Sequence, residues 1–327
     1  MPSRYTVFEA TEPGYTVDTF NFTSNQHDLD VVTEEVTPDR GHIYPKTSKG
    51  RTPREKLIGP LGWSGNIESL MYTMGTPSLF YYAMGGNTTV VDTPTLGVQQ
   101  HTVVPADTLK YFIMATGRDL REHQYVSCTV TDWSMDFAPG DPVTAKFDIN
   151  ARKELANASL NTTTATFPDY DSAERTFSGV EIDAQMGAAE GGSPSSVLTI
   201  ESANISYTNN FEDSAYVLGD QHLSGQFVNA QECTGSLELS FLTISDYDDV
   251  IADTDKEIWY TATQGAGSAE RGYIFKLPRI SYDTTNLPTQ DAERYVQSLD
   301  FTATPNVAGN NIEIVFTNDE LEAEFIA

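Results

Sequence analysis

Residues 235–244, GSLELSFLTI, decide the fold class because their apolar side chains recur at every second position. Leu237, Leu239 and Phe241 alternate with polar residues, which is the pattern of a β-strand that buries one face. Residues 65–73, GNIESLMYT, also begin with a glycine and then alternate. A glycine in a strand indicates a bulge or a close approach of another backbone. The two stretches predict matching strands about 170 residues apart.

The surroundings of these two strands indicate an internal duplication. Each strand follows a long loop, and each loop follows another strand; the loops are 37–62 and 208–234, and the earlier strands are 31–36 and 201–207. Late in each half, Ser134–Phe137 (SMDF) resembles Ser298–Phe301 (SLDF), and a turn and a final strand follow, VTAKFDIN or IEIVFTND. We therefore expect two domains of one type.

Further runs of β-branched and aromatic residues between turn signals predict more strands. They are 15–22, 29–36, 79–84, 109–116, 125–137, 143–149, 177–182, 197–207, 258–263, 273–278, 296–304 and 312–316. Hairpins are expected to turn at 138–141 and 308–310, and a short helix is expected at 246–252. The expected fold is mainly β, with two tandem β-sandwich or barrel domains and a few short helices. The expected division is a first domain at 1–150, a linker or insertion at 151–195 and a second domain at 196–327.

The chain is strongly acidic, with 47 Asp and Glu against 19 Lys and Arg and a formal net charge of −28. Such a surface disfavours direct phosphate binding, because association with nucleic acid depends on clustered cations that release counterions. It is typical of proteins that stay soluble in concentrated salt, where the screening length falls to about 3 Å. The charge predicts a halophilic source and says little about function.

Positive charge is concentrated in residues 37–62, TPDRGHIYPKTSKGRTPREKLIGPLG, which we call the basic loop. Its three prolines exclude a long helix and a central strand. It also carries apolar side chains, among them Ile43, Leu57 and Ile58, that a free loop has little reason to keep. We expect the basic loop to dock on another copy of the acidic body; a solvated loop is the alternative.

The cysteines give no sign of metal or redox chemistry. Cys128 and Cys233 lie far apart and form no CxxC or CxxH motif, so two buried small side chains are expected. The N-terminal residues lack the apolar core of a signal peptide. No apolar run approaches the roughly 18 residues that span a membrane. No cofactor, metal or membrane contact is therefore expected.

An enzyme, for example a β-sandwich hydrolase, is a competing hypothesis. The five histidines are scattered, and no HExxH or GxSxG motif is present. The aspartates of residues 246–249 lack the order of a calcium-binding loop. Because the chain has 47 acids, pairs of carboxylates could be chosen almost anywhere. The sequence therefore singles out no catalytic residue.

Four stretches together resemble the major tail tube proteins of long-tailed, siphovirus-like viruses. They are YVSCTVTDWSMDFAPGDPVTAKFDI (125–149), YVLGDQHLSG (216–225), VNAQECTGSLELSF (228–241) and DYDDVI (246–251). The resemblance implies a small β-sandwich with one helix in each domain, and rings of subunits whose strands close into a continuous β-barrel. The rings would stack into a tail around a channel for the genome. Together with the acid excess, it implies a virus of halophilic archaea.

The resemblance also implies roles for individual residues. A long loop in the family reaches between rings, and the basic loop lies at that place in the chain. The inter-ring candidates are Arg40, Tyr44, Lys46, Lys49, Arg51, Arg54 and Lys56. A DNA channel should not hold phosphate, so acidic strands suit its lining, and Glu68 and Glu238 are the lumen-facing candidates.

The implied partner is the chain itself. With two tube-type domains in each chain, a trimer with pseudo-sixfold symmetry is preferred over a hexamer, and both stay open. Tail terminator, tape-measure and distal tail proteins are further partners, and double-stranded DNA passes through during genome ejection without specific binding. The location is the virion tail, after assembly in the host cytoplasm. The alternatives are a tail hub or distal tail adaptor with duplicated tube domains and a surface adhesin, which would need an export signal.

Overall fold

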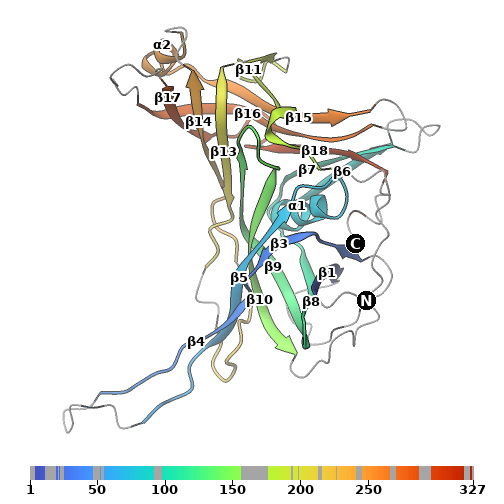
Figure 1. The fold of residues 1–327 in the computed structure, drawn as a ribbon. Coiled ribbons are helices and arrows are strands. Elements are labelled where there is room, and N and C mark those ends of the chain that lie inside the picture. Colours follow the sequence, from blue (N-terminus) through green and yellow to red (C-terminus); the bar gives the residue numbers. More distant parts are fainter. Residues whose placement is uncertain are drawn as a thin grey trace.

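In the residues that it describes, the computed structural model is a mostly β protein with two α-helices (Figure 1). It describes residues 4–11, 20, 22, 26–46, 52, 55–91, 98–155, 176–192, 194–197, 199–212, 216–225, 227–240, 245–265, 270–286, 296–319 and 325. The mainly β fold with a few short helices is therefore confirmed.

In chain order the elements are β1 Arg4–Thr11, β2 His27–Asp28, β3 Val31–Glu34, β4 Thr37–Arg40, β5 Leu61–Leu70, α1 Thr76–Met84, β6 Gly85–Val91, β7 Gln99–Pro105, β8 Tyr111–Arg118, β9 Arg121–Phe137, β10 Thr144–Leu155, β11 Asp183–Ala188, β12 Ser195–Ser196, β13 Ile200–Thr208, β14 Glu232–Ser240, α2 Ser245–Ile251, β15 Lys256–Gln264, β16 Arg271–Asn286, β17 Val296–Ala303 and β18 Glu313–Asn318. Residues 235–240 of the strand predicted at 235–244 belong to β14, and the hairpin predicted to turn at 138–141 is β9–β10.

A continuous antiparallel sheet, which we call the central sheet, passes through both halves of the chain. Its strands follow one another in the order β3 and β4, β5, β10, β9, β13, β14, β17 and β16. The long strand β9 joins the halves, because on the edge opposite β10 its first part pairs with β8 and its second part with β13. In Figure 1, β5, β9, β10, β13 and β14 run along the length of the body, whereas β16 runs across its upper end.

The strands of the two halves are paired in the same register. Thr33 on β3 opposes Glu68 on β5, and Ser202 on β13 opposes Glu238 on β14. In both pairs the register shifts immediately before this position, which is the mark of a β-bulge. A bulge at the same place in two strand pairs indicates one repeated unit.

Close to each bulge, the partner strand carries a glycine, Gly65 on β5 or Gly235 on β14, and the structure shows why. A Cβ on Gly65 would lie 1.9 Å from the Glu35 carbonyl oxygen, and a Cβ on Gly235 would lie 2.3 Å from that of Asn204. Both distances are far below van der Waals contact, so only glycine fits. The close backbone approach predicted from the strand-initial glycines is present in both strands.

Two further strand pairs repeat their bulges. The β9–β10 register skips Thr131, and the β16–β17 register skips Asp283. The β8–β9 register shifts after Phe112, and the β15–β16 register shifts after Lys256. The short outer pairs agree as well: β1 pairs with β2 and β8, and β11 pairs with β12 and β15. We call residues 4–155 repeat 1 and residues 183–303 repeat 2, and we call residues at matching register positions counterparts.

The register corrects the correspondence drawn from sequence. SMDF lies on β9 and SLDF lies on β17, and these strands are not counterparts. Leu299 on β17 opposes Leu237 on β14, as Phe147 on β10 opposes Ile67 on β5. The counterpart of SLDF is therefore KFDI in β10. Short alternating strands resemble one another by composition, so a local match does not identify the partner strand.

The closing hairpin predicted at 308–310 is also wrong. β17 pairs with residues 280–286 of β16, and β18 pairs with residues 272–276 on the same edge. The two strands therefore run end to end in one direction, with a turn at 306–309 between them. The second neighbour of β18 is β7 of repeat 1. The direction of a strand after a turn depends on which neighbouring strand edge is available for pairing, and the sequence does not show this.

The strand predicted at 79–84 is wrong, because these residues belong to helix α1. All nine residues of α1 are buried, so the helix has no polar face whose period could reveal it. Pro77 stands in its first turn, and Gly85 ends it with a left-handed φ of 88°. On α1, the Phe80 ring lies 5.0 Å from Trp133 of repeat 1 and 5.5 Å from Phe275 of repeat 2. The two repeats therefore share one core.

The segment predicted as a linker, 151–195, is partly regular. Its predicted strand at 177–182 is instead a 3₁₀ turn at Gly179–Glu181, where the Glu181 carboxylate accepts from the Ser178 amide at 3.0 Å. β11 then begins at Asp183 and pairs with β15. Residues 156–175, most of the strand predicted at 15–22, and residues 241–244 and 320–324 lie outside the described residues. The division into domains at 150 and 196 stays a prediction.

Candidate assembly edges and the polar sheet face

Repeat 2 is attached to repeat 1 through strands β13 and β9, a contact that we call the internal junction. Residues 203–208 pair with residues 132–137 in antiparallel register. The Trp133 ring stacks on Tyr207 with centroids 5.7 Å apart, and Phe137 stacks on Tyr260 at 4.8 Å. All four rings are buried. Each aromatic pair contributes about 0.5–1.5 kcal/mol beyond the burial of its area, so the junction is strong.

In repeat 2, the counterpart of this part of β9 is the end of β16, and its edge is open. Residues 281–286 pair with β17 on one side, whereas β15 ends its pairing at Ile280 on the other. Within the described ranges, no strand covers residues 281–286 on that second edge. Asp283, Thr284 and Asn286 are exposed there.

In repeat 1, the counterpart of β13 is the pair β3 and β4, and its outer edge is also without a strand among the residues that the structure describes. The inner edge pairs with β5. Beside the outer edge lies a cleft of roughly 470 Å³, lined by residues of β3 and by Thr116–Asp119 at the end of β8. Thr116 is the counterpart of Tyr260 of repeat 2, and Phe137 of β9 stacks on Tyr260 in the internal junction. The cleft is thus the place that β9 fills in the internal junction.

One face of the central sheet is polar across its width. Along β9, Asp132, Ser134 and Asp136 are more exposed than the alternating apolar residues, which face α1. The same alternation runs through β5, β10, β14 and β17. Charged residues on this face include Glu35, Glu68, Asp132, Asp136, Lys146, Asp148, Arg152, Glu232, Glu238 and Asp300. The polar face is therefore predominantly acidic.

Glu68 and Glu238, the lumen-facing candidates, are counterparts on this face. The Thr33 hydroxyl donates to Glu68 at 3.3 Å, and the Ser202 hydroxyl donates to Glu238 at 2.9 Å. These bonds hold both carboxylates along the sheet. Nearby, burial raises the pKa of Asp148, Lys146 opposes the shift, and the charge of Asp132 adds to it.

The described stretches of the basic loop, residues 37–46 and 55–62, form the two sides of an extended arm that projects from the body (Figure 1). Its two sides are joined by hydrogen bonds between Ile43 and Leu57, at 3.2 and 2.9 Å. Both side chains are about half exposed, as is Tyr44, and Ile58 is 73% exposed. As expected, the described residues of the arm form no helix, and its strand β4 is not central, because it lies at the edge of the sheet and pairs with β5. Its open apolar groups have no cover within the described part of the chain.

The arm keeps its predicted cations at the surface. Arg40, Lys46 and Lys56 are exposed, whereas Lys49, Arg51 and Arg54 lie outside the described residues. The pKa of His42 is lowered by desolvation and by the charges of Lys56 and Arg40. The arm therefore carries a positive local field, and His42 adds no charge to it at neutral pH.

The counterpart of the arm in repeat 2, the loop between β13 and β14, is docked on repeat 1. The Leu61 amide donates to the Gln221 carbonyl at 2.8 Å, and Arg152 donates to the Leu223 carbonyl at 3.0 Å. At the base of the loop, buried Asn209 donates to the Ala83 carbonyl at 2.8 Å. One long loop is thus fixed within the chain while the other projects.

The cysteines, the metal-binding side chain types and the helices are the other candidate features of the described residues. Cys128 and Cys233 are buried thiols, as predicted, and burial raises the pKa of Cys233 to about 12. Among the described residues, no three His, Cys, Asp or Glu side chains are grouped so that they could hold a metal. Within the same ranges, no helix is long and apolar enough to cross a membrane.

The described residues thus combine a duplicated antiparallel unit, a projecting arm and two strand edges that no described strand covers. A family model described as phage tail tube protein matches residues 7–307, and so spans both repeats. The chain belongs to the phage tail tube protein family. As a tube protein it is a structural component of the virion tail, and the family gives no support to the hydrolase or adhesin hypotheses. Comparison with curated proteins finds no match.

Sequence reasoning missed several features of the tube protein that matter for assembly. The strands β9 and β16 were expected, but not that the edge of one is covered and the edge of the other is open. The acidic residues of the polar face beyond Glu68 and Glu238 carried a signal, because they alternate with apolar residues in 125–137 and 296–304. The open edges carried none, since they depend on the pairing of distant strands.

Proposed function

We propose that the tube protein is the major subunit of the tail tube, and that its copies close into rings by repeating the internal junction between chains. The outer edge of β3–β4 on one copy would pair with the end of β16 on the next, as β13 pairs with β9 within one chain. The presence of both complementary edges on each copy is the observation that supports this proposal. A head-to-tail contact of this kind closes into a ring when its rotation permits, and it leaves no free edge.

Three copies would complete the ring. Each chain supplies two repeats with one register, so three chains give a pseudo-sixfold arrangement in which internal and interchain junctions alternate. A hexamer would hold twice as many repeats and a wider channel. The matched bulges support the trimer, because they make the two repeats near-equivalent units of the barrel.

The polar face would line the channel. Its predominantly acidic residues, Glu68 and Glu238 among them, would repel the phosphates of double-stranded DNA. Binding to phosphate depends on clustered cations, and Lys146 and Arg152 are outnumbered by acids on this face. The genome would therefore slide through the channel during ejection without being held.

The arm would make the contact between stacked rings. Its cations, Arg40, Lys46 and Lys56 together with Lys49, Arg51 and Arg54, would face the acidic body of the next ring, and Tyr44 and its apolar neighbours would supply a contact that salt does not screen. The tube would end on tail terminator and distal tail proteins and enclose a tape-measure protein. The net charge of −28 supports a halophilic source. The source would be a siphovirus-like virus of halophilic archaea, assembled in the host cytoplasm.

Electron microscopy of the purified protein in molar potassium chloride tests the proposal. We expect rings of three chains and stacked tubes. The amide of Trp133 faces β13, and Thr285 is the counterpart of Trp133, so the amide of Thr285 faces the uncovered edge of β16. Thr285→Pro removes this N–H and should therefore prevent ring closure. Thr285→Val is the matched control, because it loses the same hydroxyl but keeps the amide. Solitary particles at every concentration would overturn the proposal, and single rings that never stack would favour a tail hub.

A further inference from the structure

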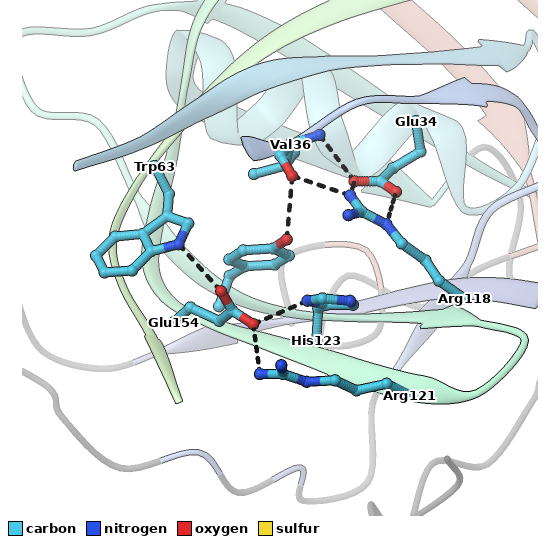
Figure 2. A network of polar contacts seen from close by, with 8 residues as sticks. Glu34, Val36, Trp63, Arg118, Arg121, His123 and Glu154 are labelled. Atoms are coloured by element: carbon cyan, nitrogen blue, oxygen red, sulfur yellow. Dashed lines mark hydrogen bonds and ion pairs between the residues drawn. The ribbon is translucent and has the colours of Figure 1, made fainter. Parts of the chain in front are cut away.

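The outer edge of β3–β4 is held by side chains of its own chain (Figure 2). The Glu35 amide donates to Asn66 on β5, so the next amide, that of Val36, faces outward. This amide donates to the Glu34 carboxylate at 2.9 Å. The Val36 carbonyl accepts from Arg118 at 2.9 Å and from the Tyr125 hydroxyl at 3.3 Å. Both backbone groups of Val36 are thus already satisfied.

The side chains that hold Val36 also hold each other. The Arg118 Nε donates to Glu34 Oε2 at 2.8 Å, and its Nη2 donates to the other carboxylate oxygen, so the pair is bidentate. The Glu34 side chain is only 8% exposed. Figure 2 shows that Glu34 and Arg118 converge on Val36, and the Tyr125 hydroxyl reaches the same carbonyl. We call these three residues the edge latch.

Repeat 2 has no such latch. The counterparts of Glu34, Arg118 and Tyr125 are Ala203, Ala262 and Leu277. None of these side chains can hydrogen-bond to a backbone group. The counterpart of Val36 is Ile205, which pairs with Met135 in the internal junction. Polar capping side chains are therefore present where the edge is open and absent where a strand covers it.

We propose that the edge latch is a gate on ring assembly, which must open before a second copy can pair with β3–β4. The inference rests on the proposed function, because it takes the end of β16 on another copy as the occupant of this edge. The Val36 amide has one hydrogen to donate, so it cannot serve Glu34 and an incoming strand together. The latch therefore raises the concentration at which rings form and protects the free subunit from unspecific strand pairing.

The first test measures assembly against concentration by sedimentation velocity. Glu34→Ala and Arg118→Ala give repeat 1 the residues of repeat 2, and both should reach half-assembly at a concentration about tenfold lower, the factor expected for one charge-assisted hydrogen-bonded pair. Glu34→Gln should shift in the same direction by less. Arg121→Ala is the matched control: it breaks a partly buried pair with Glu154 at 3.0 Å in the adjacent network and removes none of the hydrogen bonds to Val36.

The second test measures hydrogen exchange of the Val36 amide. In the dispersed wild-type subunit this amide should be protected; in Glu34→Ala it should exchange about tenfold faster or more, and in Arg121→Ala it should be unchanged. In assembled rings it should be protected in all variants. Because only one amide should respond in the subunit, this test separates an opened latch from an unfolded variant.

The outcomes distinguish the latch from the ring. Rings that form at the wild-type concentration in Glu34→Ala and Arg118→Ala would overturn the latch and leave the proposed function intact. A higher concentration for these variants would also overturn it, because the residues would then belong to the interface. Absence of rings in the wild type and in every variant would overturn both proposals.

Discussion

The two repeats have the same strands in the same register, and yet their edges differ. In repeat 2, β13 lies between β14 and β9, and its long loop is docked on repeat 1. In repeat 1, the outer edge of β3–β4 is closed by polar side chains, and its long loop projects as an arm. Backbone pairing is thus conserved between the repeats, whereas side chains decide which edge is used inside the chain.

The residues at the two edges match this difference. Trp133 and Phe137 on β9 are buried aromatic residues in the internal junction. The counterpart of Trp133 is Thr285, which is polar and only partly buried. A permanent contact within a chain can be apolar, because it is never exposed after folding. An edge that meets its partner only during assembly must stay soluble until then.

The largest expected effect comes from breaking the internal junction. Trp133→Ala should lower the free energy of unfolding by about 3–5 kcal/mol, since it removes a fully buried ring. Thr285→Ala should cost the dispersed subunit about 1 kcal/mol, through loss of its 3.0 Å hydrogen bond from Gln297. Denaturant unfolding in dilute solution measures both. Equal losses would mean that the two edges do not differ as described.

A smaller loss of stability is expected when the glycine opposite each of these strands, Gly235 or Gly65, is replaced by valine. Gly235→Val should lower the free energy of unfolding by about 2–3 kcal/mol, because β13 is confined between two strands and cannot move away. Gly65→Val should cost less, about 1–2 kcal/mol, because side chains and not a paired strand hold the outer edge of β3–β4, so the strand can shift more easily. Gly62→Ala, whose Cβ would meet only the Tyr216 hydroxyl at 3.5 Å, is the control. A larger loss at Gly65 would contradict the comparison.

A further difference concerns Asp28 of repeat 1, whose counterpart is Ser196. Burial raises the pKa of Asp28 to about 6, an effect that a backbone hydrogen bond opposes and the charge of Asp30 adds to. The folded pKa exceeds the unfolded value, so ionisation of Asp28 reduces stability as the pH rises from about 4 to 6. Asp28→Asn should therefore stabilise the subunit at pH 7, by about 1 kcal/mol after allowance for solvent. Thermal unfolding at pH 4 and pH 7 tests this, and an equal gain at both pH values would refute it.

Substitutions in the arm should have the smallest effect on the stability of the subunit and a large effect on tube formation. Replacement of Arg51, Arg54 and Lys56 by Glu should change the free energy of unfolding by less than about 0.5 kcal/mol, as is usual for surface positions. Electron microscopy should then show rings without tubes, and the same positions changed to Gln should give shorter tubes. Wild-type tubes should persist in molar salt because of the apolar groups of the arm. Dissociation on raising the salt concentration would contradict this docking mode.

The alternation of apolar and polar residues was sufficient to predict most strands and the mainly β fold. Stretches such as 125–137 and 235–244 indicate which side chains face the core, because side chains in a strand alternate between its two faces. The basic loop was recognisable from its charge and prolines, and the buried cysteines from their isolation. Helix α1 was not, since a segment buried on all sides shows no period.

The partner of each strand was decided only by the tertiary structure. Alternation marks the two faces of a strand but not its two edges, and the edges carry the hydrogen bonds that join residues far apart in the sequence. For this reason the sequence determined that the tube protein is a duplicated, acidic β protein with a cationic arm. The register, the vacant edges of β16 and β3–β4, and the meeting of Glu34 with Arg118 and Tyr125 at Val36 exist only once the sheet has formed.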